Sequence, residues 1–223
     1  MSYLVLTSEG LKARFIQEAV NAGLSLDDLV FAFNKEELRN RFDDYGHFNF
    51  LISFSTSVIV PSEYITISEQ VSINIHAASP NYPGRDPHHY AVYDGAKRYG
   101  ATLHYMTSKV DAGEIIDVEL FDFDNSVKPY ELMQMADEAA WKLIQKLFRS
   151  IKNNYELPLS EHRWYGIKRS RKDFEDFCRI NSSMDKLELQ RKIKAFHVEG
   201  YTNLFTEIHG MKFYFKPELD KKV

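Results

Sequence analysis

The chain has 223 residues, of which 44% are hydrophobic and 27% charged, with a formal net charge of −4. This composition is typical of a globular protein that buries a core, and it offers no strongly basic surface for nucleic acid. No apolar run approaches the roughly 18 residues of a membrane span, and the start MSYLVLTSEG is no signal peptide. The lone Cys178 excludes an internal disulfide and is interpreted as a packing residue, so we expect a cytoplasmic protein.

Strand and helix patterns alternate through the first two thirds of the chain. Strands are predicted for 2–7, 29–34, 48–55, 71–76, 100–107 and 114–123, and helices for 9–23, 35–42, the interval 86–98 and 129–151. Gly23 is a plausible helix stop, and Pro129 suits the first turn of the last helix. This alternation predicts an α/β fold with a mostly parallel, Rossmann-like sheet.

The pattern changes from about residue 156. A helix is predicted for 186–196, and two alternating strands within 202–215, joined at His209-Gly210, predict a β-hairpin. Residues 156–223 carry 14 Lys and Arg against 11 Asp and Glu, a net charge of +3. We therefore expect two parts, an α/β domain at 1–155 and a small α+β region at 156–223.

The turn after the first strand argues against two common ligands. It reads TSEGLKA and lacks the G-x-G-x-x-G that lets a dinucleotide approach a helix N-terminus. No Walker sequence occurs either. The predicted sheet is therefore not expected to hold NAD or ATP in the usual way.

The stretch VSINIHAASPNYPGRDPHH at 71–89 ends a predicted strand with an amide and an imidazole. Asn74 and His76 share one side of that strand, because side chains alternate with a period of two. Asp111 follows the next predicted strand. A histidine base, an amide that stabilises an oxyanion and a carboxylate that orients the imidazole would suit attack by an amine on a carbonyl. A capped strand end is the alternative that involves no catalysis.

A metal site is the third interpretation of the same histidines. His76, His88, His89 and His104 form no compact ligand pattern such as H-E-x-x-H, and no C-x-x-C occurs. We therefore expect no metal, and interpret His88 and His89 as a capped, partly exposed pair.

The spacing of these motifs is similar to that of a known family. The run N-I-H-A-A-S-P-N-Y-P-G, then G-A-T-L-H-Y-M and V-D-A-G-E-I-I, resembles the formyltransferases that use N10-formyltetrahydrofolate. The match is specific over 71–116, and the segments 52–61 and 193–215 are also similar to parts of that family. The resemblance implies a Rossmann-like formyltransferase domain at 1–155, followed by a small tail.

The resemblance also implies roles for individual residues. Asn74, His76 and Asp111 match the catalytic trio, as oxyanion stabiliser, general base and partner of the base. N10-formyltetrahydrofolate, the cosubstrate, would bind across Ser53–Pro61 and Met106–Asp111. The residues expected at the folate are Phe54, Ser55, Ser57, Ile59, Met106 and Asp111.

The loop after His76 separates three branches of that family. The purine-biosynthesis branch, which formylates glycinamide ribonucleotide, has Ser-Leu-Leu-Pro where this chain has Ala77-Ala78-Ser79-Pro80. The methionyl-tRNA branch is longer, with a basic C-terminal domain. The short loop is similar to the branch that formylates nucleotide-linked amino sugars for surface polysaccharide, such as the O-antigen of lipopolysaccharide. Ala77 departs from it, because proline is common there.

A nucleotide-linked amino sugar of the dTDP-amino-dideoxyhexose class is therefore the expected substrate, and nucleic acid and membrane are not expected partners. The nucleotide base needs an aromatic side chain to stack on, and the diphosphate needs cations. Aromatic residues are, however, more often part of the core, and clusters of Lys and Arg are more often a solvated surface. The candidate contacts are Tyr82, Arg85, His89, Trp164, Lys168, Arg169 and Tyr201. The apolar face of the hairpin is expected to pack on the catalytic domain or to form part of a homodimer interface, and a homodimer is the expected assembly. Glycinamide ribonucleotide or methionyl-tRNA as substrate, or a non-catalytic folate-binding module, are the alternatives.

Overall fold

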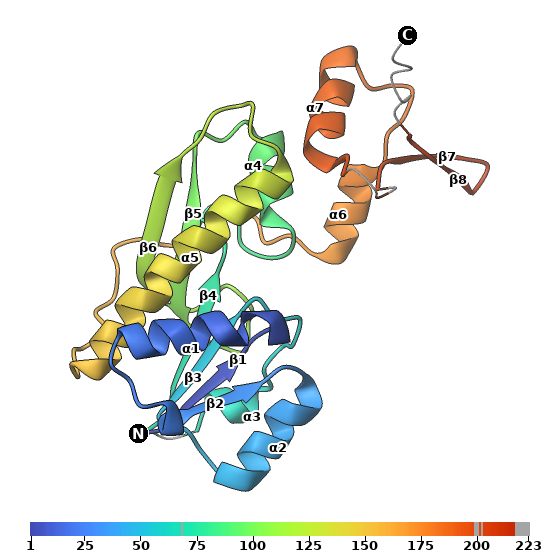
Figure 1. Ribbon diagram of the computed structural model, residues 1–223. Helices are drawn as coiled ribbons and strands as arrows, with labels where there is room; N and C mark the ends of the chain where they lie inside the picture. Colours follow the sequence, from blue (N-terminus) through green and yellow to red (C-terminus); the bar gives the residue numbers. More distant parts are fainter. Residues whose placement is uncertain (68, 199–200, 202, 217–223) are drawn as a thin grey trace.

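The structure is a computed structural model that describes residues 1–67, 69–198, 201 and 203–216 (Figure 1). The strands of the first part are β1 (Tyr3–Leu6), β2 (Leu29–Ala32), β3 (Phe50–Phe54), β4 (Val71–His76), β5 (Arg98–Tyr105) and β6 (Ile115–Asp122). Its helices are α1 (Lys12–Asn21), α2 (Lys35–Tyr45), α3 (Ser62–Ile65), α4 (Pro87–Tyr93) and α5 (Pro129–Lys152). Short 3₁₀ turns at Glu9–Leu11 and Leu26–Asp28 precede α1 and β2.

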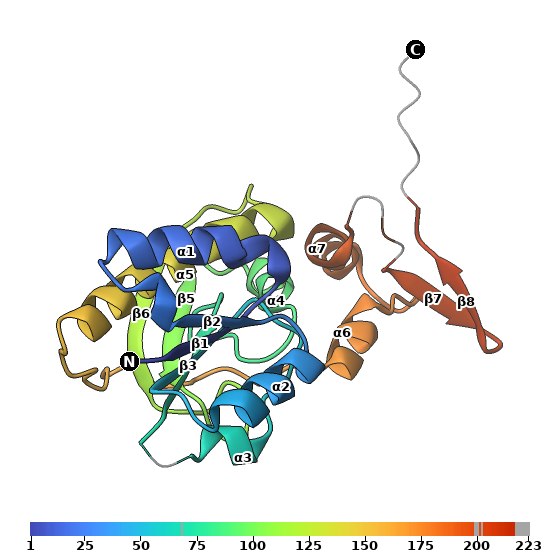
Figure 2. The same ribbon diagram turned by 60° about the horizontal axis from the view of Figure 1, so that its bottom comes forward.

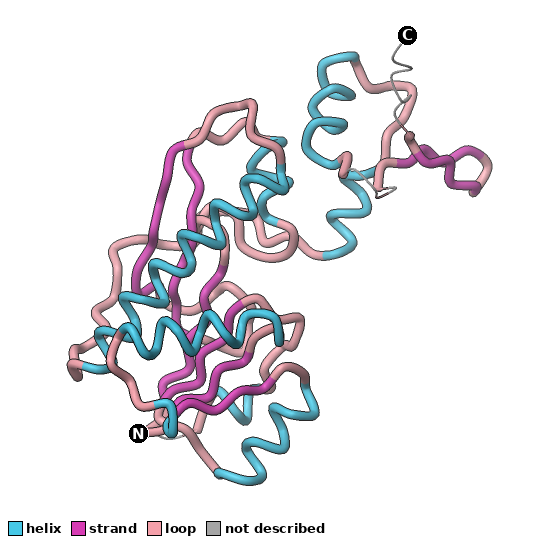
Figure 3. Tube along the Cα trace, in the orientation of Figure 1, coloured by secondary structure: helices cyan, strands magenta, loops and turns pink. Residues whose placement is uncertain are grey.

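The six strands form one sheet in the order β2-β1-β3-β4-β5-β6 (Figure 3). The pairs β1–β2, β1–β3 and β3–β4 are parallel, whereas β4–β5 and β5–β6 are antiparallel. The predicted α/β class with a mostly parallel sheet is confirmed. The reversal of β5 was not predicted, because alternation within a strand carries no information about the direction of its neighbour.

Helices cover both faces of this sheet, α1 and α5 on one side and α2 and α3 on the other (Figure 2). On the first face Phe15 of α1 packs edge-on against Trp141 of α5, with ring centroids 4.8 Å apart. On the second face Phe42 of α2 packs edge-on against Phe48 at 5.4 Å. Side chains of β1 alternate between the two faces, with Val5 in the first core cluster and Leu6 in the second. The sheet is therefore buried on both sides, as parallel sheets require.

The C-terminal part contains α6 (Arg171–Cys178), α7 (Lys186–Phe196) and the antiparallel pair β7 (Phe205–Ile208) and β8 (Met211–Tyr214). Helix α7 matches its predicted bounds and the hairpin is confirmed, although Thr202 lies outside the described residues. Helix α6 was not predicted, because its eight residues RKDFEDFC carry only a short apolar stripe. A capping box between Ser170 and Asp173 starts it.

The C-terminal helices pack against α4 of the sheet domain. His89 of α4 donates its Nδ1 hydrogen to the carbonyl of Ala195 at 2.5 Å, and its ring stacks on Phe196 of α7 at 5.7 Å. Burial lowers the pKa of His89 and lowers that of His88 to about 3, so both rings are neutral near pH 7. His89 is only 6% exposed and lies inside this interface, so the prediction of a partly exposed pair is wrong for His89, whereas His88 is partly exposed as predicted. The domain boundary at 155 and 156 stays a prediction.

None of the helices within the described ranges is long and apolar enough to cross a lipid bilayer.

Candidate functional site

The polar side chains at the end of β4 occupy the point where the sheet changes direction. Asn74 and His76 are half-buried, whereas the intervening Ile75 is 3% exposed and packs in the core. On one side β4 pairs with parallel β3, and on the other side with antiparallel β5. The apolar face of β4 thus anchors the strand, and its polar face holds the two candidate groups in register.

Asp111 reaches these side chains from the loop between β5 and β6. Its backbone has a positive φ of 48°, which is uncommon for a residue other than glycine, and its side chain is 3% exposed. One carboxylate oxygen, Oδ2, lies 3.6 Å from Nδ1 of His76 and accepts a 2.8 Å hydrogen bond from the backbone N–H of Gly84. The predicted trio of Asn74, His76 and Asp111 therefore lies together.

His104 is a fourth member of the site. It lies directly opposite Asn74 in the β4–β5 register and is 2% exposed. Its Nε2 lies 3.0 Å from Nδ2 of Asn74 and 3.6 Å from Oδ1 of Asp111. From the sequence, no catalytic role is expected for His104, which appears there as a possible metal ligand and as part of the run G-A-T-L-H-Y-M. The pattern G-x-T-x-H was the only sequence feature that pointed to His104. The cross-strand register that makes His104 a neighbour of Asn74 is not visible in one sequence.

The hydrogen-bond partners assign the tautomers of both imidazoles. Nδ1 of His104 lies 2.8 Å from the carbonyl of Tyr105 and must donate to it, so Nε2 is free to accept from the amide of Asn74. Nε2 of His76 lies 2.9 Å from the carbonyl of Tyr82 and also donates. The other nitrogen of His76 faces the carboxylate of Asp111, so each ring nitrogen of this histidine has an oxygen acceptor nearby.

The carboxyl group of Asp111 stays ionised despite its burial. Burial by itself would raise its pKa, but the charge of a protonated His76 and the N–H of Gly84 lower the pKa to about 2. Nε2 of His104 carries no hydrogen in the assigned tautomer and lies 3.6 Å from Oδ1, so it donates no hydrogen bond to the carboxylate. Asp111 therefore provides a permanent negative charge beside two imidazoles.

The residues assigned to folate lie at the end of β3, in the loop after β3 and in the loop after β5. Ser55, with a positive φ of 50°, begins the loop after β3, and Ser57 and Ile59 are exposed in it. Phe54 is 2% exposed and packs in the core, so only its backbone can face a ligand. Met106 is half-buried against the same core cluster as Val58 and Val60, two apolar residues of this loop. The two predicted folate segments therefore share one core cluster.

The residues assigned to the amine substrate are divided between several places. Tyr82 and Arg169 line a cavity of about 310 Å³ together with Tyr90, whose buried hydroxyl has no hydrogen-bond partner among the described residues. Trp164 lies against His76 and His104, and Lys168 donates to the carbonyl of Val110. Arg85 is exposed and pairs with Asp86 at 3.1 Å, while Tyr201 is 69% exposed beyond α7. His89 lies in the interface described above.

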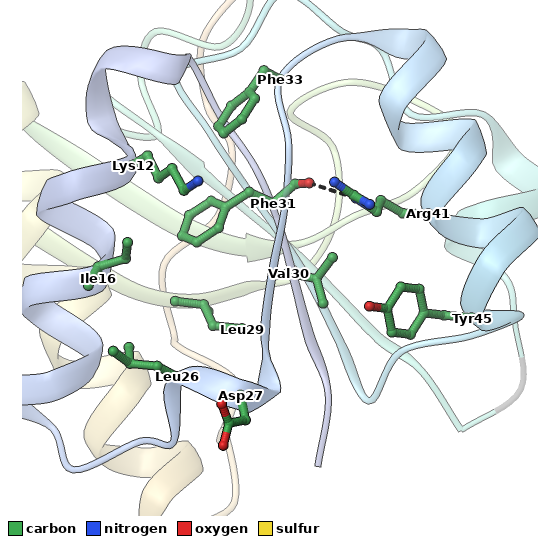
Figure 4. A pocket seen from close by; sticks show the side chains of 10 residues that line it. All are labelled: Lys12, Ile16, Leu26, Asp27, Leu29, Val30, Phe31, Phe33, Arg41 and Tyr45. Atoms are coloured by element: carbon green, nitrogen blue, oxygen red, sulfur yellow. Dashed lines mark hydrogen bonds between the residues drawn. The ribbon is translucent and has the colours of Figure 1, made fainter.

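A larger cavity, of about 370 Å³, lies along the open edge of β2 between α1 and α2 (Figure 4). Lys12 and Arg41 line it from opposite sides, and Arg41 donates to the carbonyl of Phe31 at 3.1 Å. Strands β1 and β3 separate this cavity from β4, so it has no part in the trio. Within the described residues, no three His, Cys, Asp or Glu side chains are placed to hold a metal ion.

Comparisons of the sequence with known proteins point to formyltransferases. The sequence model of the family described as formyl transferase matches residues 34–146. A methionyl-tRNA formyltransferase of Mycoplasma capricolum is 25% identical over 194 residues, which are 85% of this chain and 61% of that enzyme. The chain therefore spans less than two thirds of the length of this relative.

Two solved structures are similar over most of their length. A sugar N-formyltransferase from Shewanella superposes with a TM-score of 0.74 at 20% identity, covering 97% of both chains. An N-formyltransferase from Helicobacter canadensis, in complex with folinic acid and dTDP-3-aminofucose, superposes with a TM-score of 0.69 at 19% identity, covering 95% of this chain and 86% of that one. At these identities the likeness establishes the fold.

The low pKa of Asp111 predicts a pH-dependent loss of stability in Asp111→Asn. The folded pKa of about 2 lies below the ordinary 3.8, so the stabilisation by the charge is complete above about pH 5 and is lost as the pH falls towards 2. Asp111→Asn should lower the free energy of unfolding by roughly 2 kcal/mol at neutral pH and by progressively less in acid. Urea unfolding at several pH values measures this.

Asp44→Asn is the matched control, because Asp44 is exposed on α2. It should leave the free energy of unfolding within about 0.5 kcal/mol of the wild type at every pH. A deficit in Asp111→Asn that stays constant from neutral to acidic pH would show that the carboxylate charge is not stabilising.

Proposed function

The chain belongs to the formyl transferase family, and on that premise we propose that it moves the formyl group of N10-formyltetrahydrofolate to an amine. The acceptor is the amino group of a nucleotide-linked amino sugar of the dTDP-amino-dideoxyhexose class, and the product serves surface polysaccharide biosynthesis. The observation that carries the proposal is the meeting of Asn74, His76 and Asp111 at one strand end, with an ionised carboxylate 3.6 Å from the imidazole.

The proposed reaction is an acyl transfer between two nitrogens. The amine nitrogen attacks the formyl carbon, and the amide of Asn74 donates to the oxyanion that forms. His76 takes the proton that the amine releases and delivers it to N10 of folate as the C–N10 bond breaks. The products are the formamide and tetrahydrofolate. Asp111 remains a carboxylate throughout, accepts from His76 and stabilises its imidazolium.

This mechanism requires the Tyr82 carbonyl to leave His76. In the described conformation the carbonyl accepts from Nε2 at 2.9 Å and occupies the place where an amine must approach. We propose that the incoming amine displaces this carbonyl and that the proton of the imidazole moves to the nitrogen facing Asp111. Nε2 is then free to act as the base, since a neutral imidazole carries one proton and one lone pair.

Folate is proposed to bind over the loop after β3 and the segment that begins at Met106. The backbone of Phe54 and the exposed Ser55, Ser57 and Ile59 form one side of this place, and Asp111 lies at its inner end. The pterin is a flat ring with hydrogen-bonding edges, which exposed backbone at strand ends can recognise. The Helicobacter canadensis structure holds folinic acid, a formylated folate, and so supports a folate cosubstrate.

The amino-sugar acceptor is supported by the better superposition on a sugar enzyme and by the dTDP-sugar in the Helicobacter canadensis structure. The chain covers 97% of the Shewanella sugar enzyme at a TM-score of 0.74, and 89% of a methionyl-tRNA formyltransferase from Clostridium thermocellum at a TM-score of 0.62. Methionyl-tRNA is the second candidate substrate, because the sequence relative acts on it by name. We propose a cytoplasmic enzyme, since the single cysteine, Cys178, is buried and fits a reducing compartment.

We also propose that the enzyme is a homodimer joined through the β7–β8 hairpin. All four residues of β8 are exposed, among them Met211 at 59% and Phe213 at 50%, and Ile208 of β7 is 51% exposed. A two-stranded hairpin is marginally stable by itself, and such an apolar surface is typical of an interface. A second copy of the chain would bury these side chains.

Release of tetrahydrofolate, followed by absorbance, tests the proposed function. The wild-type protein with N10-formyltetrahydrofolate should release it only after addition of an amino-sugar nucleotide. A panel of dTDP-linked 3-amino and 4-amino dideoxyhexoses, GDP-perosamine, glycinamide ribonucleotide and methionyl-tRNA identifies the acceptor. Release with methionyl-tRNA alone would favour the second candidate, and no release with any amine would leave only a folate-binding module.

Substitutions in the trio should separate catalysis from binding. His76→Asn should lower turnover by roughly 10²–10⁴ with both substrates still bound, since a positioned general base has that effect. Asn74→Ala should lower turnover by roughly 10²–10³ through the oxyanion. The double variant His76→Asn with Asp111→Asn should be little slower than the slower single variant, because groups that act as a unit are not additive. Losses that multiply would contradict the pairing of His76 with Asp111.

Light scattering tests the dimer. The wild-type protein should be dimeric at micromolar concentration, and Phe213→Glu with Met211→Lys should give a folded monomer, because two charges would be buried in the interface. Leu187→Lys is the control, since Leu187 of α7 is 75% exposed outside the hairpin. A wild-type monomer would refute the proposal.

A further inference from the structure

The linker between α5 and α6 crosses the loops that hold the site. In Figure 1 it is the orange segment that runs from the end of α5 across the sheet to α6. We call residues 160–169 the strap. Its first hydrogen bond joins Ser160 to Ile115, at the start of β6. The following bonds alternate between the loop after β5 and the loop after β4, and they join Trp164 to Gly113, Tyr165 to Pro80, Lys168 to Val110 and Arg169 to Pro83 and Arg85.

Two glycines let the strap approach the loop after β4 at backbone contact. A Cβ on Gly166 would lie 1.7 Å from the carbonyl oxygen of Asn81. A Cβ on Gly84 would lie 2.3 Å from the carbonyl oxygen of Arg169, and Gly84 has a φ of +95°, which L side chains rarely adopt. The N–H of Gly84 donates to Asp111, so the strap contacts the residue that holds the carboxylate.

Trp164 is the residue of the strap that contacts the site directly. Its ring centroid lies 5.1 Å from that of His104, edge to face at 86°, and 6.0 Å from that of His76. Its Nε1–H donates to the carbonyl of Gly113 at 2.8 Å, two residues after Asp111 in the same loop. One half-buried indole thus contacts both imidazoles and the loop that carries the carboxylate.

We propose that Trp164 is a positioning residue for the His76–Asp111 pair, supplied by the linker rather than by the sheet domain. The inference rests on the proposed formyl transfer. The indole wall limits rotation of the His76 ring once the Tyr82 carbonyl withdraws. It also keeps water from the pair, and a lower local dielectric strengthens the attraction between the imidazolium and the carboxylate. The hydrogen bond to Gly113 fixes the wall and the Asp111 loop relative to each other.

The contact is tested first without activity, by the ¹H–¹³C NMR signals of the histidine ring C–H groups at fixed pH. An indole next to an imidazole shifts these signals through its ring current. Trp164→Leu should move the His76 and His104 signals, and Trp164→Phe should move them less. Tyr155→Leu, which removes a 68% exposed aromatic from the same linker, should leave them unchanged. Unchanged signals in Trp164→Leu would overturn the inference.

Kinetics with the acceptor that the wild type uses then test the positioning role. Trp164→Leu should lower kcat by about 10–100-fold with each KM within about threefold, because a small misplacement of a reacting group reduces rate more than binding. Trp164→Phe should recover part of the loss by keeping an aromatic wall. Circular dichroism and thermal unfolding confirm that each variant is folded at the assay temperature.

The decisive measurement combines Trp164→Leu with His76→Asn. If Trp164 acts through His76, the double variant is no slower than His76→Asn alone. Losses that multiply, or a raised KM with unchanged kcat, would overturn the positioning role while leaving the proposed function intact. A wild-type enzyme that transfers no formyl group would refute the proposed function and the catalytic role of Trp164, whereas the NMR result would still report on the contact.

Discussion

The carboxylate of Asp111 is almost completely buried, and burial of a charge is unfavourable unless donors and opposite charges surround it. Here the compensation comes from the backbone N–H of Gly84 and the imidazole of His76, and the positive φ of Asp111 turns the side chain inward towards them. The two compensating groups lie on the loop after β4 and on β4 itself. One charge therefore holds the end of β4 and the loops after β4 and β5 in a single arrangement.

The direction of β5 makes this meeting possible. The parallel strands deliver their carboxyl ends to one edge, where the loop after β3 and the end of β4 lie side by side. Antiparallel β5 instead places His104 opposite Asn74, and the loop that follows it turns back towards His76. A fully parallel sheet would place the end of β5 beside the end of β4 and would need another way to bring a buried histidine between Asn74 and Asp111.

The sequence allowed the polar end of β4 to be predicted because its determinants are local. Alternation places Asn74 and His76 on one side, and the motif around Asp111 has a recognisable spacing. The bounds of β4 and α7 were also predicted correctly, since both elements have strong periodicity. Helix α6, the reversal of β5 and the role of His104 depend on contacts between distant parts of the chain. His89 was misplaced for the same reason, because its partner Ala195 lies 106 residues away.

Because of the strap, the site extends further along the chain than the sheet and the helices that cover it. The buried residues of the core cluster between the sheet and helices α1 and α5 end with Phe148 and Ile151, but the wall beside His76 comes from residues further along the chain. In a chimera of two related enzymes with its junction just after α5, the sheet would therefore come from one parent and Trp164 from the other. A junction after Arg169, at the start of α6, keeps His76, Asp111 and Trp164 from one parent. The exchanged unit would then consist of α6, α7 and the hairpin.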